Sequence, residues 1–319
     1  MTTTEHPGPG GGRQPVSLTA SSSRIGEKIV MALLWACAVV SILTTVGIVV
    51  ILFEEAATFF ENEGISVGSF LTGTEWMPFG SADQGRFGVL PLVAGTMLVT
   101  VIALIVAVPL GLASAAYLSE YAPARVRRYL KPTLEVLAGV PTVVLGYFAL
   151  TFMTPLLRAT AGHLTDVSVF NAASAGIVMG IMIVPTIASL SEDAMSAVPT
   201  ALREGAYGLG SSKGHVVTRI VMPAALSGIV AAVILGLGRA IGETMIVAIA
   251  GGGLPSLTYN PFDQIQAMTA YIVQAVQGEA PRGSLTYQSI FAVGALLFVM
   301  TLAVNLIAAR FVRRYREAY

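Results

Sequence analysis

Residues 199–223 read PTALREGAYGLGSSKGHVVTRIVMP and form a polar stretch between two long hydrophobic runs. The flanking runs are Phe170–Leu190 and Ala224–Ala250. Each is long enough to cross a hydrocarbon core of about 30 Å, which takes about 20 apolar residues. A polar loop held between two such runs predicts a membrane protein that exposes this loop to water.

The composition of the whole chain agrees with a membrane protein. Hydrophobic residues make up 55% of the 319 residues and charged residues only 11%, whereas soluble domains carry about 25% charged residues. In lipid the backbone must satisfy its own hydrogen bonds, so the runs should be helices. We therefore expect an all-α membrane protein with six transmembrane helices. The other four runs are Ile29–Phe53, Gly88–Leu118, Leu134–Leu157 and Tyr287–Val312.

The distribution of positive charge predicts the orientation of these helices. Fourteen of the eighteen Lys and Arg residues lie in the two tails and in the loops after the second and fourth runs, and only three lie on the other side. Such an excess marks the cytosolic side of a membrane. Both termini and the loop at 191–223 are therefore expected in the cytosol.

The same pattern divides the chain into regions. A tail at 1–23, rich in Gly, Pro, Ser and Thr, is expected to be disordered. The six-helix domain covers 24–315, and 316–319 form a second cytoplasmic tail. The loops at 54–87 and 251–286 would face the outside.

The first outer loop carries six acidic residues around the segment Trp76–Pro78: Glu54, Glu55, Glu61, Glu63, Glu75 and Asp83. Acidic loops are often no more than solvated surface. The alternative is a docking surface for an extracytoplasmic partner, with Gly251–Gly283 as a second such surface. Both interpretations stay open at this point.

The polar stretch at 199–223 predicts a short amphipathic helix. Pro199 and Thr200 suit a helix start, and Gly210 suits its end. Leu202, Ala206 and Leu209 repeat at helical spacing. An apolar stripe of this kind lies either on the membrane surface or in a groove of a partner protein.

The spacing within this stretch resembles the EAA loop of ABC importer permeases. The matching positions are Glu204, Ala206, Gly210, Ile220 and Pro223, with Gly205 in place of Ala and Met222 in place of Leu. In that family the loop contains a helix that docks on a separate ATPase subunit. The resemblance implies that this chain is the membrane part of an ATP-driven importer.

The fifth run carries two charges, Arg239 and Glu243, at the spacing of one helical turn. If the helix is continuous, they share one face and can pair. Charges within a membrane helix mark function by default. The pair is either a structural salt bridge or an anion contact, because a guanidinium matches phosphate or sulfate oxygens with two parallel hydrogen bonds. Glu243 would then orient Arg239 and accept a hydrogen bond from protonated phosphate, which would disfavour sulfate.

The segment around this pair, GRAIGETM at 238–245, resembles the fifth-span motif of bacterial phosphate permeases of the PstC type. It makes Arg239, Glu243 and Thr244 candidates for the substrate path. The resemblance extends over roughly residues 25–315. It implies a bacterial inner-membrane assembly with a PstA-like permease, two PstB-like ATPases and a PstS-like phosphate-binding receptor. It implies no nucleic-acid partner.

No Gly-x-x-x-x-Gly-Lys-Ser/Thr loop for nucleotide phosphates occurs in the sequence. We therefore expect a chain without enzyme activity and without cofactor or metal, with ATP and Mg²⁺ bound by the partner ATPase. The alternatives are a sulfate or molybdate permease of the same architecture, an ion-coupled secondary transporter, and a membrane enzyme that uses Glu243 as an acid–base group.

Overall fold

The computed structural model describes residues 25–62, 64–78, 85–163, 165–278 and 280–314. The predicted tails at 1–23 and 316–319, and the charges Arg13, Arg24, Glu63, Asp83 and Arg316, lie outside these residues. The contacts divide the chain into two units, residues 1–50 and 51–319. In the first unit the described part is one helical segment with exposed apolar side chains.

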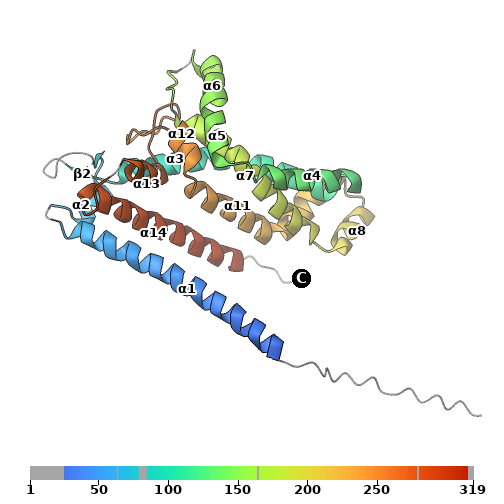
Figure 1. Cartoon of the computed structure of the whole chain (residues 1–319). Helices are drawn as coiled ribbons and strands as arrows, with labels where there is room; N and C mark the ends of the chain where they lie inside the picture. The colour runs from blue at the N-terminus through green and yellow to red at the C-terminus, as the bar shows by residue number, and fades with distance from the viewer. Residues whose placement is uncertain (1–24, 63, 79–84, 164, 279, 315–319) are drawn as a thin grey trace, which may run out of the picture. The chain divides into compact units, whose positions relative to one another are not determined.

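The described part of the chain is mostly helical and contains one hairpin of two short strands (Figure 1). Three of the helical segments, labelled η, are π-helical turns. The elements are α1 (Ile25–Phe60), α2 (Val67–Thr72), β1 (Trp76–Met77), β2 (Arg86–Phe87), α3 (Leu90–Ala116), η1 (Tyr117–Tyr121), α4 (Ala124–Leu137), α5 (Thr142–Phe148), η2 (Ala149–Met153), α6 (Thr154–Ala161), α7 (Ala172–Ser196), α8 (Thr200–Gly208), α9 (Lys213–Val216), η3 (Val217–Val221), α10 (Met222–Ala224), α11 (Leu226–Ile241), α12 (Met245–Ala250), α13 (Met268–Gln277) and α14 (Leu285–Arg314).

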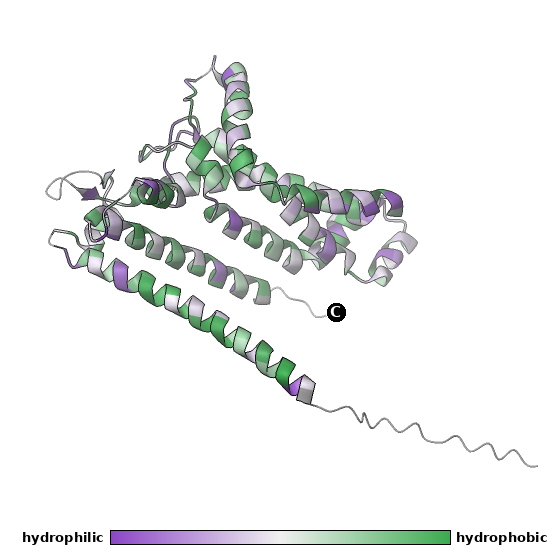
Figure 2. Cartoon of the chain, in the orientation of Figure 1, coloured by the Kyte–Doolittle hydropathy of each residue, from purple (hydrophilic) through white to green (hydrophobic). Residues whose placement is uncertain are grey.

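Six membrane-crossing segments fit the described residues when one bent pair is counted as a single span. Five are uninterrupted, and the sixth joins Lys213–Ala224 to Leu226–Ile241 at a bend of 74°. The five uninterrupted segments are Gly26–Phe60, Leu90–Tyr121, Thr142–Ala161, Ala172–Ser196 and Leu285–Arg310. Figure 2 shows mostly hydrophobic residues along α14, and hydrophilic residues gathered on α4 and α8.

Two of the predicted spans are interrupted in the structure. The third was expected at Leu134–Leu157, but its uninterrupted helical segment begins at Thr142. Pro141, which lacks an N–H and has an extended backbone with ψ 131°, separates it from α4. The fifth was expected to run unbroken over Ala224–Ala250. It bends at Ala225, ends at Ile241 and resumes only as the short helix α12.

The centre of the structure is the packing of α7 against α3. Glycines on both helices bring the two backbones close together: a Cβ atom on Gly180 would lie 2.8 Å from the carbonyl oxygen of Ala103, and one on Gly111 would lie 2.8 Å from Ile187. Small residues at such crossings allow the tight van der Waals packing that holds membrane helices together. The apolar core continues from here into α11 and α12.

Two further clusters mark the opposite ends of α3. Near Leu92 an aromatic cluster joins the end of α1, the hairpin and α13, with Trp76 edge-on to Tyr271 at 4.9 Å between ring centroids. Near Ala115 an apolar cluster joins the end of α7 to α8 and to η3. The loops predicted to face outside and the loop predicted to face the cytosol therefore lie at opposite ends of one helix.

Replacing Gly180 by Ala should destabilise the fold, because the new methyl group meets the Ala103 carbonyl rather than a flexible side chain. We expect a loss of about 1–3 kcal/mol, measured as a fall of about 2–4 °C in melting temperature for each kcal/mol. Gly238→Ala is the matched control in another membrane helix, since its Cβ would have no neighbour nearer than 3.8 Å. Equal melting temperatures for both variants would contradict the proposed close packing.

Candidate functional site

The predicted coupling helix is present as α8, which begins after Pro199 and ends at Gly208. Gly210 follows with φ +80°, a left-handed conformation that favours glycine, and the N–H of Ser211 donates to the carbonyl of Ala206 at 3.1 Å. Helix α8 thus ends two residues before Gly210, the position at which the sequence predicted its end. Gly210 itself forms the turn that closes the helix.

The predicted apolar stripe of α8 is split between interior and surface. Ala206 is buried, in the apolar cluster at the end of α7, where Ile220 packs beside it. Leu202 remains exposed, and Leu209 is 89% exposed. Glu204, Gly205 and Pro223 are also exposed. The structure thus brings Ala206 and Ile220 together and leaves the other matched positions on the surface.

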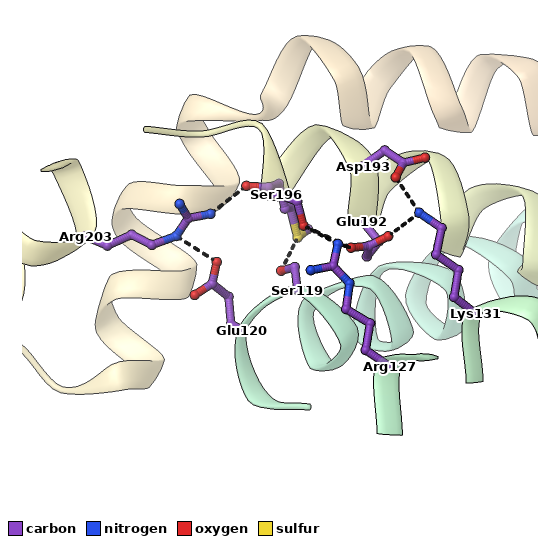
Figure 3. A network of polar contacts seen from close by, with 9 residues as sticks. Ser119, Glu120, Arg127, Lys131, Glu192, Asp193, Ser196 and Arg203 are labelled. Atoms are coloured by element: carbon purple, nitrogen blue, oxygen red, sulfur yellow. Dashed lines mark hydrogen bonds and ion pairs between the residues drawn. The ribbon is translucent and has the colours of Figure 1, made fainter. Parts of the chain in front are cut away.

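Arg203 anchors α8 to the end of α7. Its guanidinium donates to the carbonyl oxygens of Met195 at 2.7 Å and Val198 at 2.5 Å, and to a carboxylate oxygen of Glu120 in η1 at 3.0 Å. Arg203 therefore adds side-chain donors to a carbonyl at the end of α7 and to one just after it, and ties α8 to that end and to η1 (Figure 3).

A second ionic contact, centred on Glu192, lies one turn earlier on α7 (Figure 3). The carboxylate of Glu192 is completely buried. It accepts hydrogen bonds from Arg127 and from Lys131 at 2.7 Å, both on α4, and from Ser196 at 2.9 Å. Lys131 also pairs with Asp193. We call the six charged side chains of these two contacts the charge network: Glu120, Arg127, Lys131, Glu192, Asp193 and Arg203.

The charge network balances three cations against three carboxylates. A buried carboxylate is stable only when it is paired and hydrogen-bonded, and both conditions hold for Glu192. Burial alone would lower the pKa of Lys131, but hydrogen bonds to Asp193 and Glu192 outweigh burial and raise this pKa above its ordinary value. A raised lysine pKa adds stability below its ordinary pKa and loses it only as the pH rises through the folded value. The Lys131 contacts therefore persist at neutral pH.

Sequence reasoning missed the charge network because it ended the fourth span at Leu190 and assigned Glu192 to a loop. One signal was available. Arg127 and Lys131 are four residues apart and so share a face of α4. The local sequence pattern does not indicate that this face meets the end of α7.

The expected pairing of Arg239 with Glu243 is wrong. The helix that carries Arg239 ends at Ile241, so the two residues do not lie on one helical face. Arg239 instead donates to the hydroxyl of Thr186 on α7 at 3.3 Å and to the carbonyl of Ala138, directly after α4, at 3.4 Å. Within the part of the chain that the structure describes, no carboxylate pairs with Arg239.

Glu243 serves the next helix. Its Oε1 accepts hydrogen bonds from the backbone N–H groups of Met245 at 3.1 Å and Ile246 at 3.3 Å, the first residues of α12. Its own carbonyl accepts a hydrogen bond from Thr269 at 2.8 Å. A carboxylate at a helix start satisfies free N–H groups and complements the helix dipole. Glu243 therefore bonds the start of α12 and forms no ion pair with Arg239.

Thr244, the third residue of the predicted substrate path, is half-buried between α11 and α12. Its hydroxyl bonds only locally, to the carbonyl of Gly242 at 3.3 Å. Across residues 25–314, apart from the few positions that the structure leaves undescribed, no three His, Cys, Asp or Glu side chains gather as a metal site would require.

At the opposite end of α3, Glu75 of the predicted outer loop pairs with Arg86 across the hairpin. A cavity of about 510 Å³ lies between this hairpin and the segment around Gly253 and Pro255. The two segments expected to dock an extracytoplasmic partner therefore border one cavity.

The chain matches the family of binding-protein-dependent transport system inner membrane components over residues 107–317. A probable ABC transporter permease protein of Bacillus subtilis, YqgH, is 35% identical over 83% of this chain and 84% of its own length. The phosphate transport system permease protein PstC of Haemophilus influenzae is 33% identical, covering 78% of this chain and 82% of its own. PstC 1 of Mycobacterium tuberculosis is 34% identical, covering 77% and 81%.

Two solved transporter structures are similar in fold. A bacterial ABC transporter involved in alginate import has a TM-score of 0.58 at 16% identity, with 92% of this chain and all of that chain covered. The MetNI methionine ABC transporter in an inward-facing conformation has a TM-score of 0.52 at 20% identity, with 72% and 94% covered. At these identities the likeness establishes the fold alone.

Arg203→Ala should loosen α8, because it removes donors from two carbonyls and leaves the carboxylate of Glu120 without its cation. We expect amide hydrogen exchange in 200–208 to become about tenfold faster, the effect of losing a hydrogen bond to a charged group. The matched control is Arg219→Ala, an exposed arginine of the same loop. Unchanged exchange in the Arg203 variant would contradict the anchoring role.

Proposed function

The chain belongs to the family of binding-protein-dependent transport system inner membrane components, and we propose that it is the permease subunit through which an ATP-driven importer moves inorganic phosphate. The coarser part of this statement is established: the chain is a multi-pass membrane protein and a permease subunit with the all-α architecture of type I ABC importers. The transported substrate, the energy source and the partner subunits are the parts that we propose.

Arg239 is the observation that carries the phosphate assignment. It lies half-buried in a membrane helix, where an uncompensated cation is costly. Its two protein partners are neutral oxygens at 3.3 and 3.4 Å, which is long for contacts of a charged donor. A guanidinium has five N–H donors, so Arg239 keeps donors for an anion. The relatives named as phosphate transport permeases give that anion its identity.

Glu243 contributes to selectivity in this proposal in a way that differs from the sequence-based expectation. One carboxylate oxygen holds the start of α12, and the other remains to accept a hydrogen bond from a protonated phosphate oxygen. Sulfate at neutral pH has no such proton and would meet only the negative charge. A sulfate or molybdate permease of the same architecture is the competing assignment.

We propose that the partner ATPases act on this chain through α8. Its exposed side chains Glu204 and Leu202, with Leu209 after it, form the surface that an ATPase groove would bury. Two PstB-like ATPases, a PstA-like permease and a PstS-like receptor complete the proposed assembly in a bacterial inner membrane. The receptor would dock on the hairpin and on the segment around Gly253. ATP and Mg²⁺ would be bound by the ATPases, and no catalysis is assigned to this chain.

The proposal is tested by reconstituting the whole complex in vesicles with the receptor and measuring uptake of phosphate, sulfate and molybdate with and without ATP. We expect phosphate uptake that requires ATP. Uptake that needs an ion gradient and no ATP would show a secondary transporter. Uptake of molybdate or sulfate in place of phosphate would overturn the cargo assignment.

Arg239 and Glu243 variants in the same vesicles test the site. Arg239→Ala should lower phosphate uptake by at least about tenfold, since a bidentate charged contact contributes about 1.5–3 kcal/mol. Arg239→Lys keeps the charge but loses the planar fork, so an intermediate rate is expected. Glu243→Gln keeps an oxygen for α12 and should reduce the preference for phosphate over sulfate. Uptake by Arg239→Ala at the normal rate would exclude Arg239 from the path.

A further inference from the structure

Helix α4 is held to the rest of the chain in an unusual way. None of its residues is buried, so apolar packing contributes little to its position. Its first half is held by Arg127 and Lys131, which reach Glu192 and Asp193 of α7. Its last turn is followed by Ala138, whose carbonyl accepts a hydrogen bond from Arg239. Charged contacts therefore hold α4 at both ends.

The same short end of α7 also holds α8. Glu192 and Asp193 bind α4, and the carbonyls of Met195 and Val198 bind Arg203 of α8. Ser196 lies between the two contacts: its hydroxyl donates to Glu192 and accepts from Arg127 at 3.0 Å. Figure 3 shows the side chains of α4 and α8 converging on this segment. A displacement of α8 would thus act through the end of α7 on the anchor of α4.

We propose that Glu192 is a positioning residue that couples α8 to α4, so that movement of the ATPase-docking helix is passed through α4 to the Ala138–Arg239 contact. This inference rests on the function proposed above. The buried carboxylate suits the task because it has no water to replace a lost partner, so it keeps both cations of α4 in place. Contacts at the protein surface would exchange readily with solvent and would transmit less.

A purely structural salt bridge predicts a different outcome. If Glu192 only stabilises the fold, its loss lowers ATP hydrolysis and phosphate uptake in proportion, through the amount of intact complex. If Glu192 couples the two helices, the complex continues to hydrolyse ATP while transporting less phosphate for each ATP. The number of phosphates moved per ATP hydrolysed therefore separates the two roles.

The experiment compares wild type and Glu192→Gln in the complete reconstituted complex, with both quantities measured in the same vesicles. We expect the ratio of phosphate to ATP to fall at least about fivefold, the lower end of the range for coupling between sites. Arg127→Gln and Lys131→Gln each leave Glu192 with one cation. If the complex with Glu192→Gln fails to assemble, these two variants distinguish coupling from a purely structural role. Arg125→Gln, on the same helix with its side chain exposed, is the matched control and should keep the normal ratio.

A second measurement follows the two helices directly. The sequence has a single cysteine, Cys37, so spin labels can be placed at Tyr129 on α4 and at Tyr207 on α8 in a Cys37→Ser background. Both positions are exposed, at 75% and 42%. We expect one narrow distance distribution in the wild type with and without nucleotide, and a broad distribution in the Glu192 and Arg127 variants.

An unchanged phosphate-to-ATP ratio in these variants, or a proportional fall in both rates with the distance unchanged, would overturn the inference. Failure of the wild-type complex to transport phosphate would instead overturn the function proposed above. The two failures are therefore distinguishable within one set of vesicles.

Discussion

The structure depends on one constraint, that backbone N–H and C=O groups inside a membrane protein must find partners away from water. An unbroken helix meets this constraint by itself, but this chain breaks its helices at several places. At three of them a polar side chain supplies hydrogen bonds. Arg203 donates to carbonyls at and just after the end of α7, Arg239 donates to the carbonyl after α4, and Glu243 accepts from the first N–H groups of α12. The charges that looked functional in the sequence thus have structural partners as well.

The permease therefore combines tightly packed helices with helices that are attached through polar contacts. The pair α3 and α7 is packed backbone to backbone through glycines and has little freedom to deform. Helix α4, in contrast, has no buried residue and is attached to α7 through side-chain charges, and α8 is attached through both Arg203 and the buried Ala206. A transporter needs elements that can take two positions. A helix without buried side chains, such as α4, is better suited to such a change than the packed core.

The sequence predicted the class of fold and the number of spans because both follow from the length of the apolar runs. It also predicted α8, since Pro199 and Gly210 bound it chemically. It did not predict the break at Gly242, because hydropathy averages over a few polar or small residues. The wrong pairing of Arg239 with Glu243 followed from this, since i, i+4 reasoning holds only in an unbroken helix. The partners of Glu192 are distant in sequence, and local patterns carry no information about them.

The three π-helical turns carry a consequence for how this chain tolerates insertions and deletions. A π-helical turn closes its hydrogen bonds over one more residue than an α-helical turn does. Removing one residue from Val217–Val221 would convert η3 to ordinary α-helix. The helical side chains that follow would then be rotated by about 100° around the helix axis. The residues next in line are those of the 74° bend. A single-residue deletion there would therefore change the direction in which the following side chains point, an effect that no substitution at those positions can reproduce.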